Sequence, residues 1–468
     1  MAQQRQYDVI VIGGGSTGEN AAGYARENGL SVALVESELV GGECSYWACM
    51  PSKALLRPGE VLAAARRVPA AASAVTGTID VDKALRSRDK FASEWNDDGQ
   101  AEWLASVDVD LVRGHGRLAG DRTVEVDTDS GDRITLTART AVVVATGSTA
   151  AVPPIEGLRD IATWDNRDVT SAKQVPARLL VLGGGVVGVE MAQAYRRLGA
   201  EEVTIVEMGD RLLANEEPFV GAEVAEAFAD EGIRVLTGAK ATKATRESAD
   251  APVTLTLDDG TELVGDELVV AVGRQARTDD IGVDTVGLTP GRYLEVDDRL
   301  RVTGVDGGWL YAAGDVNGRA LLTHQGKYQA RLVGDIIAGR DVTAWADNRA
   351  VPRVVFTDPQ VAAVGKTEQQ ARDAGIEVRT VHYDIGDVAA GALHGKGVSG
   401  TAQLVIDQAR RVVVGATFVG PAVGELVHAA TIAIVGEVPM DTLWHAVPAF
   451  PTLSEVWLRL LEADRALG

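Results

Sequence analysis

One pattern occurs twice in this chain of 468 residues and constrains its fold more than any other feature. Each copy is an apolar strand, a Gly-x-Gly-x-x-Gly turn, a helical stretch, a second apolar strand and a terminal acid. The first copy runs from Asp8 to Glu36 and the second from Leu179 to Glu207. A parallel sheet needs a crossover between its strands, and the helix supplies it. Each copy therefore predicts a doubly wound α/β domain.

The two glycine turns predict two nucleotide sites. The first Gly allows the sharp bend, the second lets backbone approach a pyrophosphate, and the third lets helix pack on strand. The helix N-terminus offers N–H groups to phosphates, and the terminal acid accepts a hydrogen bond from an adenosine ribose. A packing turn without a ligand is the alternative. The residues are Gly13, Gly15, Gly18 and Glu36 in the first copy, and Gly183, Gly185, Gly188 and Glu207 in the second.

The acid of the second copy bears on cofactor choice. A carboxylate at Glu207 would repel the 2′-phosphate of NADP(H). No arginine follows it directly, and Arg211 is the nearest cation. The second site is therefore expected to prefer NAD(H) over NADP(H).

Turns and small residues divide the chain. Two further strands end at Thr146-Gly147 and Gly273-Arg274, and a turn-rich stretch leads to Gly314-Asp315. No nucleotide pattern appears after about Pro352. We predict one nucleotide domain from residues 1–150 and 276–345, a second from 151–275, and a C-terminal α+β domain from 346–468.

Composition limits the partners of this chain. Its 67 Asp and Glu outnumber 45 Lys and Arg, giving a formal net charge of −22, which disfavours nucleic acid and anionic membranes. No apolar run approaches the roughly 18 residues that span a bilayer, and the N-terminus carries no secretion signal. The histidines show no metal-ligand spacing. We expect a cytoplasmic protein without a metal site.

Cys44 and Cys49 are the only cysteines, in the segment Gly41-Gly-Glu-Cys-Ser-Tyr-Trp-Ala-Cys-Met-Pro-Ser-Lys53. Five residues of regular helix advance about 7.5 Å, whereas a disulfide wants Cα atoms within about 6.8 Å. The turn between them must be distorted if they bridge, and such strain suits a reactive bond. Zinc would need two more ligands nearby. Two inert buried thiols are the alternative.

With the two nucleotide patterns, this segment resembles the pyridine nucleotide–disulfide oxidoreductase family, which includes lipoamide dehydrogenase, glutathione reductase and mercuric reductase. The resemblance covers nearly the whole chain, and Gly-Gly-x-Cys-x4-Cys-x-Pro-Ser-Lys is its most specific part. It implies that the first site binds FAD, the second binds NADH, and the C-terminal domain forms a homodimer. It also implies electron flow from NADH through FAD to a Cys44–Cys49 disulfide, with Cys49 on the flavin side and Cys44 exchanging with substrate.

The resemblance assigns further residues. Asp315 matches the acid that holds the flavin ribityl chain. Lys53 and Glu190 match an ion pair beside the flavin ring, where a cation stabilises developing negative charge. His324 follows, as a histidine often does near the flavin. The expected cofactor-binding set also includes Thr146, Gly147, Gly273, Arg274 and Gly314.

The match breaks near the C-terminus. Disulfide-reducing members carry His-Pro-Thr-x-x-Glu, whose histidine is an acid–base group delivered across the dimer interface. Here Phe450 stands at the histidine position, while Glu455 remains. A positioned acid–base group is worth about 10²–10⁴ in rate. His445 is one candidate to replace it, and Tyr46 is another, although its usual pKa near 10 makes it a weak base.

The alternative is an acceptor that takes electrons directly from reduced flavin. Phe450, Trp47 and Trp444 could offer a stacking surface to a quinone or dye, or simply pack at an interface. Mercuric reductase is disfavoured because its extra C-terminal cysteine pair is absent, and transhydrogenase because of Glu207. We predict an FAD-dependent oxidoreductase with a disulfide acceptor. A quinone or dye reductase and a non-enzymatic redox sensor are the alternatives.

Overall fold

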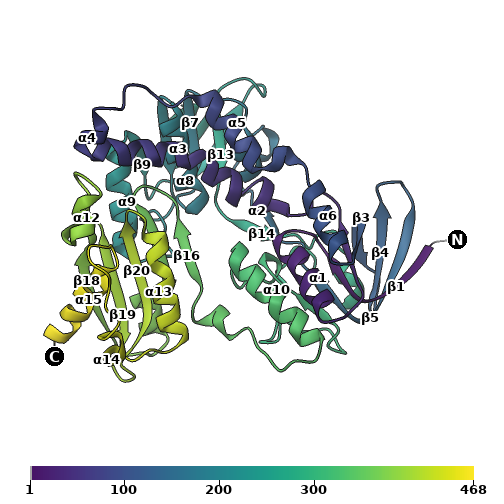
Figure 1. The fold of residues 1–468 in the computed structure, drawn as a ribbon. Helices are drawn as coiled ribbons and strands as arrows, with labels where there is room; N and C mark the ends of the chain where they lie inside the picture. The colour runs from purple at the N-terminus through teal and green to yellow at the C-terminus, as the bar shows by residue number, and fades with distance from the viewer. Residues whose placement is uncertain (1–2, 468) are drawn as a thin grey trace. The chain divides into compact units, whose positions relative to one another are not determined.

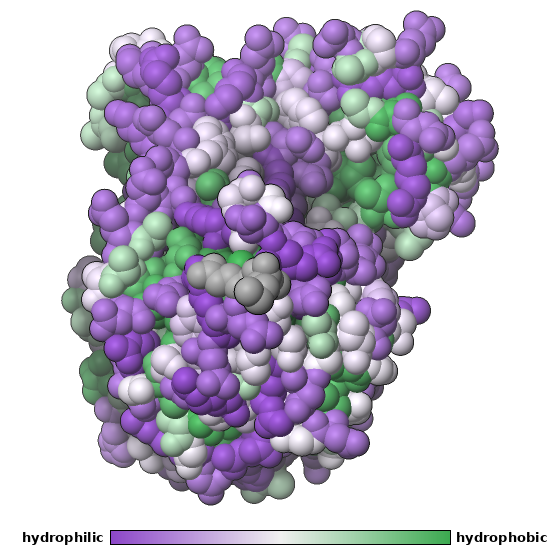
Figure 2. Space-filling view, turned by 90° about the vertical axis from the view of Figure 1, so that its right-hand side faces the viewer, coloured by the Kyte–Doolittle hydropathy of each residue, from purple (hydrophilic) through white to green (hydrophobic). Residues whose placement is uncertain are grey.

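A computed structural model describes residues 3–467 and divides the chain into two compact units. The first comprises residues 3–51, 88–151 and 274–347, and the second comprises 52–87, 152–273 and 348–467. Among the described residues, no helix combines the length and apolar character needed to cross a membrane. Hydrophilic side chains cover most of the face seen in Figure 2, as the excess of acidic residues leads one to expect.

The first unit is built on a six-stranded sheet (Figure 1). Its parallel part has the order β3-β2-β1-β5-β15, which is the doubly wound arrangement expected of a nucleotide domain, and β4 pairs antiparallel with β3 and β5. The strands are β1 (Gln3–Ile12), β2 (Val32–Glu36), β3 (Val109–Leu118), β4 (Thr123–Thr128), β5 (Arg133–Val144) and β15 (Leu310–Ala312). A short pair joins β6 (Ser148–Ala150) to β14 (Arg274–Ala276).

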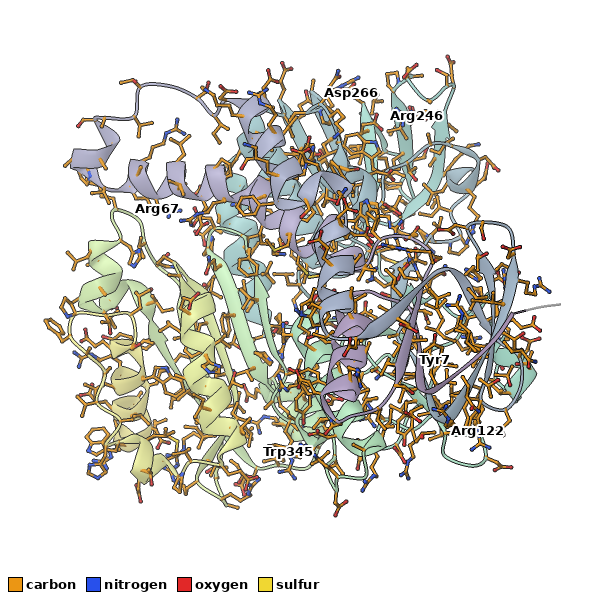
Figure 3. All side chains as sticks on the ribbon, turned by 45° about the vertical axis from the view of Figure 1, so that its right-hand side comes forward. Tyr7, Arg67, Arg122, Arg246, Asp266 and Trp345 are labelled. Carbon is orange, nitrogen blue, oxygen red and sulfur yellow. The ribbon has the colours of Figure 1, made fainter. Side chains whose placement is uncertain are left out.

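Side chains of β1 alternate between two cores, as a strand buried on both faces requires. Val9 and Val11 pack with α1 (Ser16–Glu27) and α10 (Thr323–Ile337), which lie side by side in Figure 1. Ile10 and Ile12 join the core on the other face. Tyr7 of β1, labelled in Figure 3, donates a hydrogen bond from its hydroxyl to Asp110 Oδ2 at 2.7 Å.

The remaining helices of the first unit are short. They are α2 (Gly42–Tyr46), α6 (Asp98–Ser106) and the 3-10 turns η1 (Ser93–Trp95), η3 (Val283–Val286), η4 (Asp315–Asn317) and η5 (Trp345–Asn348). Two longer helices, α3 (Cys49–Arg67) and α5 (Val81–Phe91), each have residues in both units.

The second unit contains a parallel sheet of order β13-β7-β8-β9. Val181 packs on one face with α8 (Val186–Leu198) and α9 (Pro218–Asp230), whereas Leu180 and Leu182 pack on the other with an antiparallel three-stranded sheet. In Figure 3, Arg246 lies near Asp266, whose carbonyl accepts a hydrogen bond from it at 3.1 Å. The strands are β7 (Arg178–Leu182), β8 (Glu202–Val206), β9 (Ile233–Leu236), β13 (Glu267–Val270), β10 (Ala241–Arg246), β11 (Val253–Leu257) and β12 (Glu262–Gly265).

The C-terminal part of the second unit is an antiparallel five-stranded sheet of order β16-β17-β20-β19-β18. Helices α13 (Val423–Val435) and α15 (Glu455–Ala466) contribute to its core. The strands are β16 (Pro352–Val355), β17 (Gln360–Gly365), β18 (Val378–Asp384), β19 (Thr401–Asp407) and β20 (Val412–Gly420). The predicted class, two doubly wound nucleotide folds and a C-terminal α+β region, is confirmed.

Candidate active site

The two glycine turns have the backbone geometry that their sequences predict. Gly13 and Gly183 have φ of +97° and +110°, which favour glycine. A Cβ on Gly18 would lie 1.8 Å from the Gly13 carbonyl oxygen, and one on Gly188 would lie 2.0 Å from that of Gly183. The third glycine of each motif is therefore required by close packing of helix against turn.

The terminal acid of each motif is held against its glycine turn. Glu36 Oε2 accepts a hydrogen bond from the Gly14 N–H at 2.5 Å, and Glu207 Oε2 accepts one from Gly184 at 2.6 Å. The other oxygen of Glu207 accepts from the Gly209 N–H at 2.6 Å. Burial raises the pKa of Glu36. Both acids thus lie at the turn, where an adenosine ribose would be recognised.

The helix ends at these turns suit phosphates. No described side chain caps α1 or α8, and a glycine, Gly15 or Gly185, stands at each N-cap. An added Cβ at Gly15 would meet its nearest atom at 3.9 Å, and at Gly185 no described atom beyond its chain neighbours and own helix lies within 4 Å. Uncapped N–H groups facing open space fit a dinucleotide pyrophosphate at both sites.

Gly185→Ala tests the second site without disturbing the fold. Its φ of −79° suits alanine and its Cβ meets no described atom, so only the bound nucleotide should clash. We expect KM for NADH to rise at least about tenfold with unchanged melting temperature and flavin content. Gly77→Ala, which also enters open space, is the control. An unchanged KM would contradict nucleotide binding at this turn.

The cysteine segment shows the predicted distortion. Helix α2 ends at Tyr46, Trp47 has a non-helical φ of −136°, and a new helix begins at Cys49. This break brings Cys44 and Cys49 together as thiols joined by a hydrogen bond. That bond and burial raise the pKa of Cys44 above its usual value. The Cys44 thiol is therefore harder to ionise than an ordinary thiol.

Thr323 also belongs to this site, although no sequence motif marks it. Its Oγ1 lies 3.3 Å from Cys49 Sγ at the start of α10. A hydrogen bond from Thr323 and the positive charge of Lys327, one turn further along α10, both act to lower the pKa of Cys44. A hydroxyl that donates a hydrogen bond to a thiolate stabilises the charged form of the thiol, so Thr323 favours ionisation within the Cys44–Cys49 pair.

Thr323→Val should make the reduced thiols harder to ionise. Loss of one hydrogen bond to a charged acceptor is worth about 1–2 kcal/mol, which raises a thiol pKa by about one unit. Alkylation by iodoacetamide near pH 7 should therefore slow up to about tenfold and recover at higher pH. Thr323→Ser should restore the wild-type profile. Identical profiles for valine and threonine would show that the hydroxyl does not stabilise the thiolate.

Asp315 lies in a small polar cluster. Ser148 Oγ donates to its Oδ2 at 2.6 Å, and Arg274 Nε lies 3.8 Å from the same oxygen. Burial raises the pKa of Asp315, and these two partners oppose the rise. Arg277, a residue that the sequence did not mark, pairs with Glu43 beside Cys44 at 3.1 Å.

Of the other predicted cofactor residues, Thr146, Gly147, Gly314 and His324 belong to the first unit, whereas Gly273 belongs to the second. The Thr146 hydroxyl donates to the Arg277 carbonyl at 2.7 Å, and the Gly147 carbonyl accepts from the Arg277 N–H at 3.1 Å. Gly273 has a φ of +145°. Gly314, with φ of +78°, donates its N–H to Gln329 Oε1 at 2.7 Å, and His324 is exposed on α10.

Lys53 and Glu190 form the ion pair that the resemblance predicts. Lys53 Nζ lies 2.8 Å from Glu190 Oε2, and the Glu190 side chain is 2% exposed. The second oxygen, Oε1, accepts a hydrogen bond from the Phe356 N–H at 2.9 Å. A buried carboxylate is thus neutralised by one cation and oriented by one backbone donor.

The C-terminal segment keeps its acid but exposes Phe450, whose surface is 75% accessible. Glu455 is buried and accepts from Arg459 at 2.6 Å, and its Oε2 has no hydrogen-bond partner among the described residues. His445 is exposed. The Arg465 guanidinium lies 3.6 Å from the centroid of the Trp444 ring, so one face of this ring is already covered.

Tyr46 does not suit the role of base. Its hydroxyl donates to the Val40 carbonyl at 3.0 Å, and burial raises its pKa to about 12. It is a packing residue of the cysteine segment. No group of three or more potential His, Cys, Asp or Glu metal ligands occurs within residues 3–467.

Comparison with known families decides the class of the chain. Residues 7–330 match the family described as pyridine nucleotide-disulphide oxidoreductase, and residues 351–460 match its dimerisation domain. The chain belongs to this oxidoreductase family. Its members are FAD-binding enzymes that use a pyridine nucleotide.

Relatives in this oxidoreductase family include mercuric reductases and dihydrolipoyl dehydrogenases. The mercuric reductase of Staphylococcus aureus is 30% identical over 96% of this chain and 81% of its own length. The dihydrolipoyl dehydrogenase of Mycobacterium tuberculosis is 32% identical over 96% of each chain, and that of Thermus scotoductus is 33% identical over 99% and 98%.

Solved structures confirm the fold of this oxidoreductase. LpdA from Mycobacterium tuberculosis superposes with a TM-score of 0.84 and 26% identity over the whole of both chains. The HOCl-induced flavoprotein disulfide reductase RclA from Escherichia coli gives 0.84 over 97% and 99% of the two chains, and at 23% identity it bears on the fold alone.

Proposed function

We propose that this oxidoreductase passes electrons from NADH through FAD to a disulfide substrate, using Cys44 and Cys49 as its redox-active pair. The observation that carries the proposal is the contact between the two sulfurs across the break between α2 and α3. A pair of thiols in contact and partly exposed can form and exchange a disulfide, whereas two separated buried thiols cannot.

Three residues of this chain have separate roles in the proposed reaction. The flavin, when bound, supplies hydride chemistry. Cys49, with Thr323 at 3.3 Å, holds the thiolate. Cys44, with the raised pKa, keeps its proton until exchange with substrate. Lys53, paired with Glu190, is proposed to supply the cation near the flavin ring, as the family resemblance implies.

NADH is the proposed reductant because the carboxylate of the second nucleotide motif would repel a 2′-phosphate. Both oxygens of Glu207 accept backbone N–H groups of the turn. Arg211 is engaged with the Ala214 carbonyl at 2.9 Å and with Asp210 at 3.4 Å. A 2′-phosphate would meet a carboxylate held by two backbone N–H groups, and the nearest cation in sequence, Arg211, already contacts Ala214 and Asp210.

A quinone or dye acceptor is the second candidate, and the exposed Phe450 favours it. An aromatic side chain that is 75% exposed can stack on a flat acceptor, and no described histidine stands at this position of the motif. We further propose a homodimer, because the chain carries the family's dimerisation domain. We also propose a cytoplasmic location, because two cysteines in a reactive pair suit a reducing compartment better than a secreted disulfide framework does.

Purified protein tests this function directly. Bound FAD should be visible in the absorption spectrum, and NADH should be oxidised at least about tenfold more efficiently than NADPH. A panel of lipoamide, glutathione disulfide and a quinone should reveal the acceptor. Folded protein that holds flavin but does not oxidise NADH with any acceptor would contradict the proposal and leave a flavin- and NADH-binding redox sensor. Folded protein without flavin would contradict the oxidoreductase and the sensor alike.

A further inference from the structure

We infer that Phe356 is a positioning residue that fixes the ammonium group of Lys53. This inference rests on the proposed function, because it concerns the cation that we assign to the flavin ring. Phe356 follows β16 directly, and neither the nucleotide motifs nor the cysteine segment marks it.

The Phe356 ring and the Glu190 carboxylate hold Lys53 together. The Lys53 ammonium lies 4.9 Å from the centroid of the Phe356 ring and 2.8 Å from Glu190 Oε2. An ammonium within about 6 Å of a ring centroid is attracted to the negative face of the ring. The lysine, whose side chain is 33% exposed, is therefore contacted by an anion and by an aromatic face.

The backbone of Phe356 serves the same ion pair. Its N–H donates to Glu190 Oε1, while Lys53 binds Oε2, so the buried carboxylate is shared between the two. One residue thus orients the anion through its main chain and restrains the cation through its ring. A lysine has a long and flexible stem, so a second contact narrows where its charge can lie.

Helix α8 holds this segment in place. Gln193, one turn after Glu190, accepts from the Asp358 N–H at 2.8 Å and donates to the Asp358 carbonyl at 2.9 Å. Arg197, a further turn along, binds the Asp358 carboxylate at 2.8 Å, and Arg67 of α3, labelled in Figure 3, pairs with the same group. These contacts fix the backbone around Asp358, and therefore the place from which the Phe356 side chain starts.

Burial does not explain an aromatic residue here. Phe356 is 39% exposed. A leucine would keep the backbone bond to Glu190 and much of the apolar contact. The feature that only an aromatic side chain supplies is the face presented to Lys53.

The test compares Phe356→Leu with Phe356→Tyr in the flavin-loaded protein. We expect Phe356→Leu to slow flavin reduction by NADH about 3- to 10-fold and to lower the flavin midpoint potential, while Phe356→Tyr keeps both at wild-type values. In a Lys53→Met background, Phe356→Leu should have no further effect. Acetylation of Lys53 in protein stripped of flavin, mapped by mass spectrometry, should be faster in Phe356→Leu.

The experiment distinguishes failure of this inference from failure of the proposed function. Wild-type protein without flavin or NADH oxidation would remove the proposed function, and the acetylation rate would still report on the Lys53–Phe356 contact. Equal effects of Phe356→Leu with and without Lys53 would overturn the inference, as would wild-type acetylation in Phe356→Leu. If Phe356→Leu does not fold, loss of the wild-type potential in a folded Phe356→Tyr would overturn it too.

Discussion

Replacing Cys44 and Cys49 by serine together should lower NADH-dependent disulfide reduction to below about one-thousandth of the wild-type rate. Serine cannot form the mixed disulfide through which thiol exchange proceeds. The effect should be measured as NADH oxidation with lipoamide and glutathione disulfide. Quinone reduction should keep most of its rate, because electrons can leave from the flavin without the sulfurs.

The single variants separate the two sulfurs. Cys44→Ser should abolish disulfide reduction, because Cys44 is assigned to exchange with substrate, and should spare quinone turnover. Ser45→Ala, in the same short helix, is a matched control and should leave both activities intact. Full disulfide reduction by the double variant would contradict the assignment of the cysteines.

Placing histidine at position 450 should raise disulfide turnover about 10- to 100-fold near neutral pH if this position lost an acid–base group. Glu455 has an Oε2 that lacks a hydrogen-bond partner among the described residues, and such an oxygen can orient an imidazole. The rate of the variant should then depend on a group with a pKa near 6.5, the ordinary value for histidine.

Two controls define the source of that gain. Phe450→Asn removes the ring but adds no proton-transfer group, so it should not reproduce the increase. Glu455→Gln combined with Phe450→His should lose most of it. A folded Phe450→His protein whose disulfide turnover equals that of wild type would indicate that the segment no longer serves thiol chemistry. That result would favour a quinone or dye as the electron acceptor.

The nucleotide folds could be predicted closely because their constraints are local. Each strand, glycine turn and helix is contiguous in sequence, and the third glycine is fixed by a contact with the first, five residues earlier. The distortion of the cysteine segment could also be predicted from local sequence. Two cysteines five residues apart in a regular helix lie too far apart to bridge. The sequence predicts a distorted turn if the cysteines bridge, and the structure places the distortion at Trp47.

The rest of the site depends on contacts between distant segments. Thr323 reaches Cys49 only because α10 packs beside α1, and nothing in the sequence around a threonine indicates such a contact. Phe356 likewise meets Lys53 across more than 300 residues of chain. The place of Tyr46 between the cysteines suggests a base, but its hydrogen bond to the Val40 carbonyl and its burial give it a packing role.

The most direct test of the central claim is an anaerobic reductive titration of the flavin-loaded protein. If Cys44 and Cys49 form a redox-active disulfide in contact with the flavin, full reduction should consume about four electrons per flavin, two for each couple. The double serine variant should consume about two. Uptake of only two electrons by wild-type protein purified in its oxidised form would contradict the account.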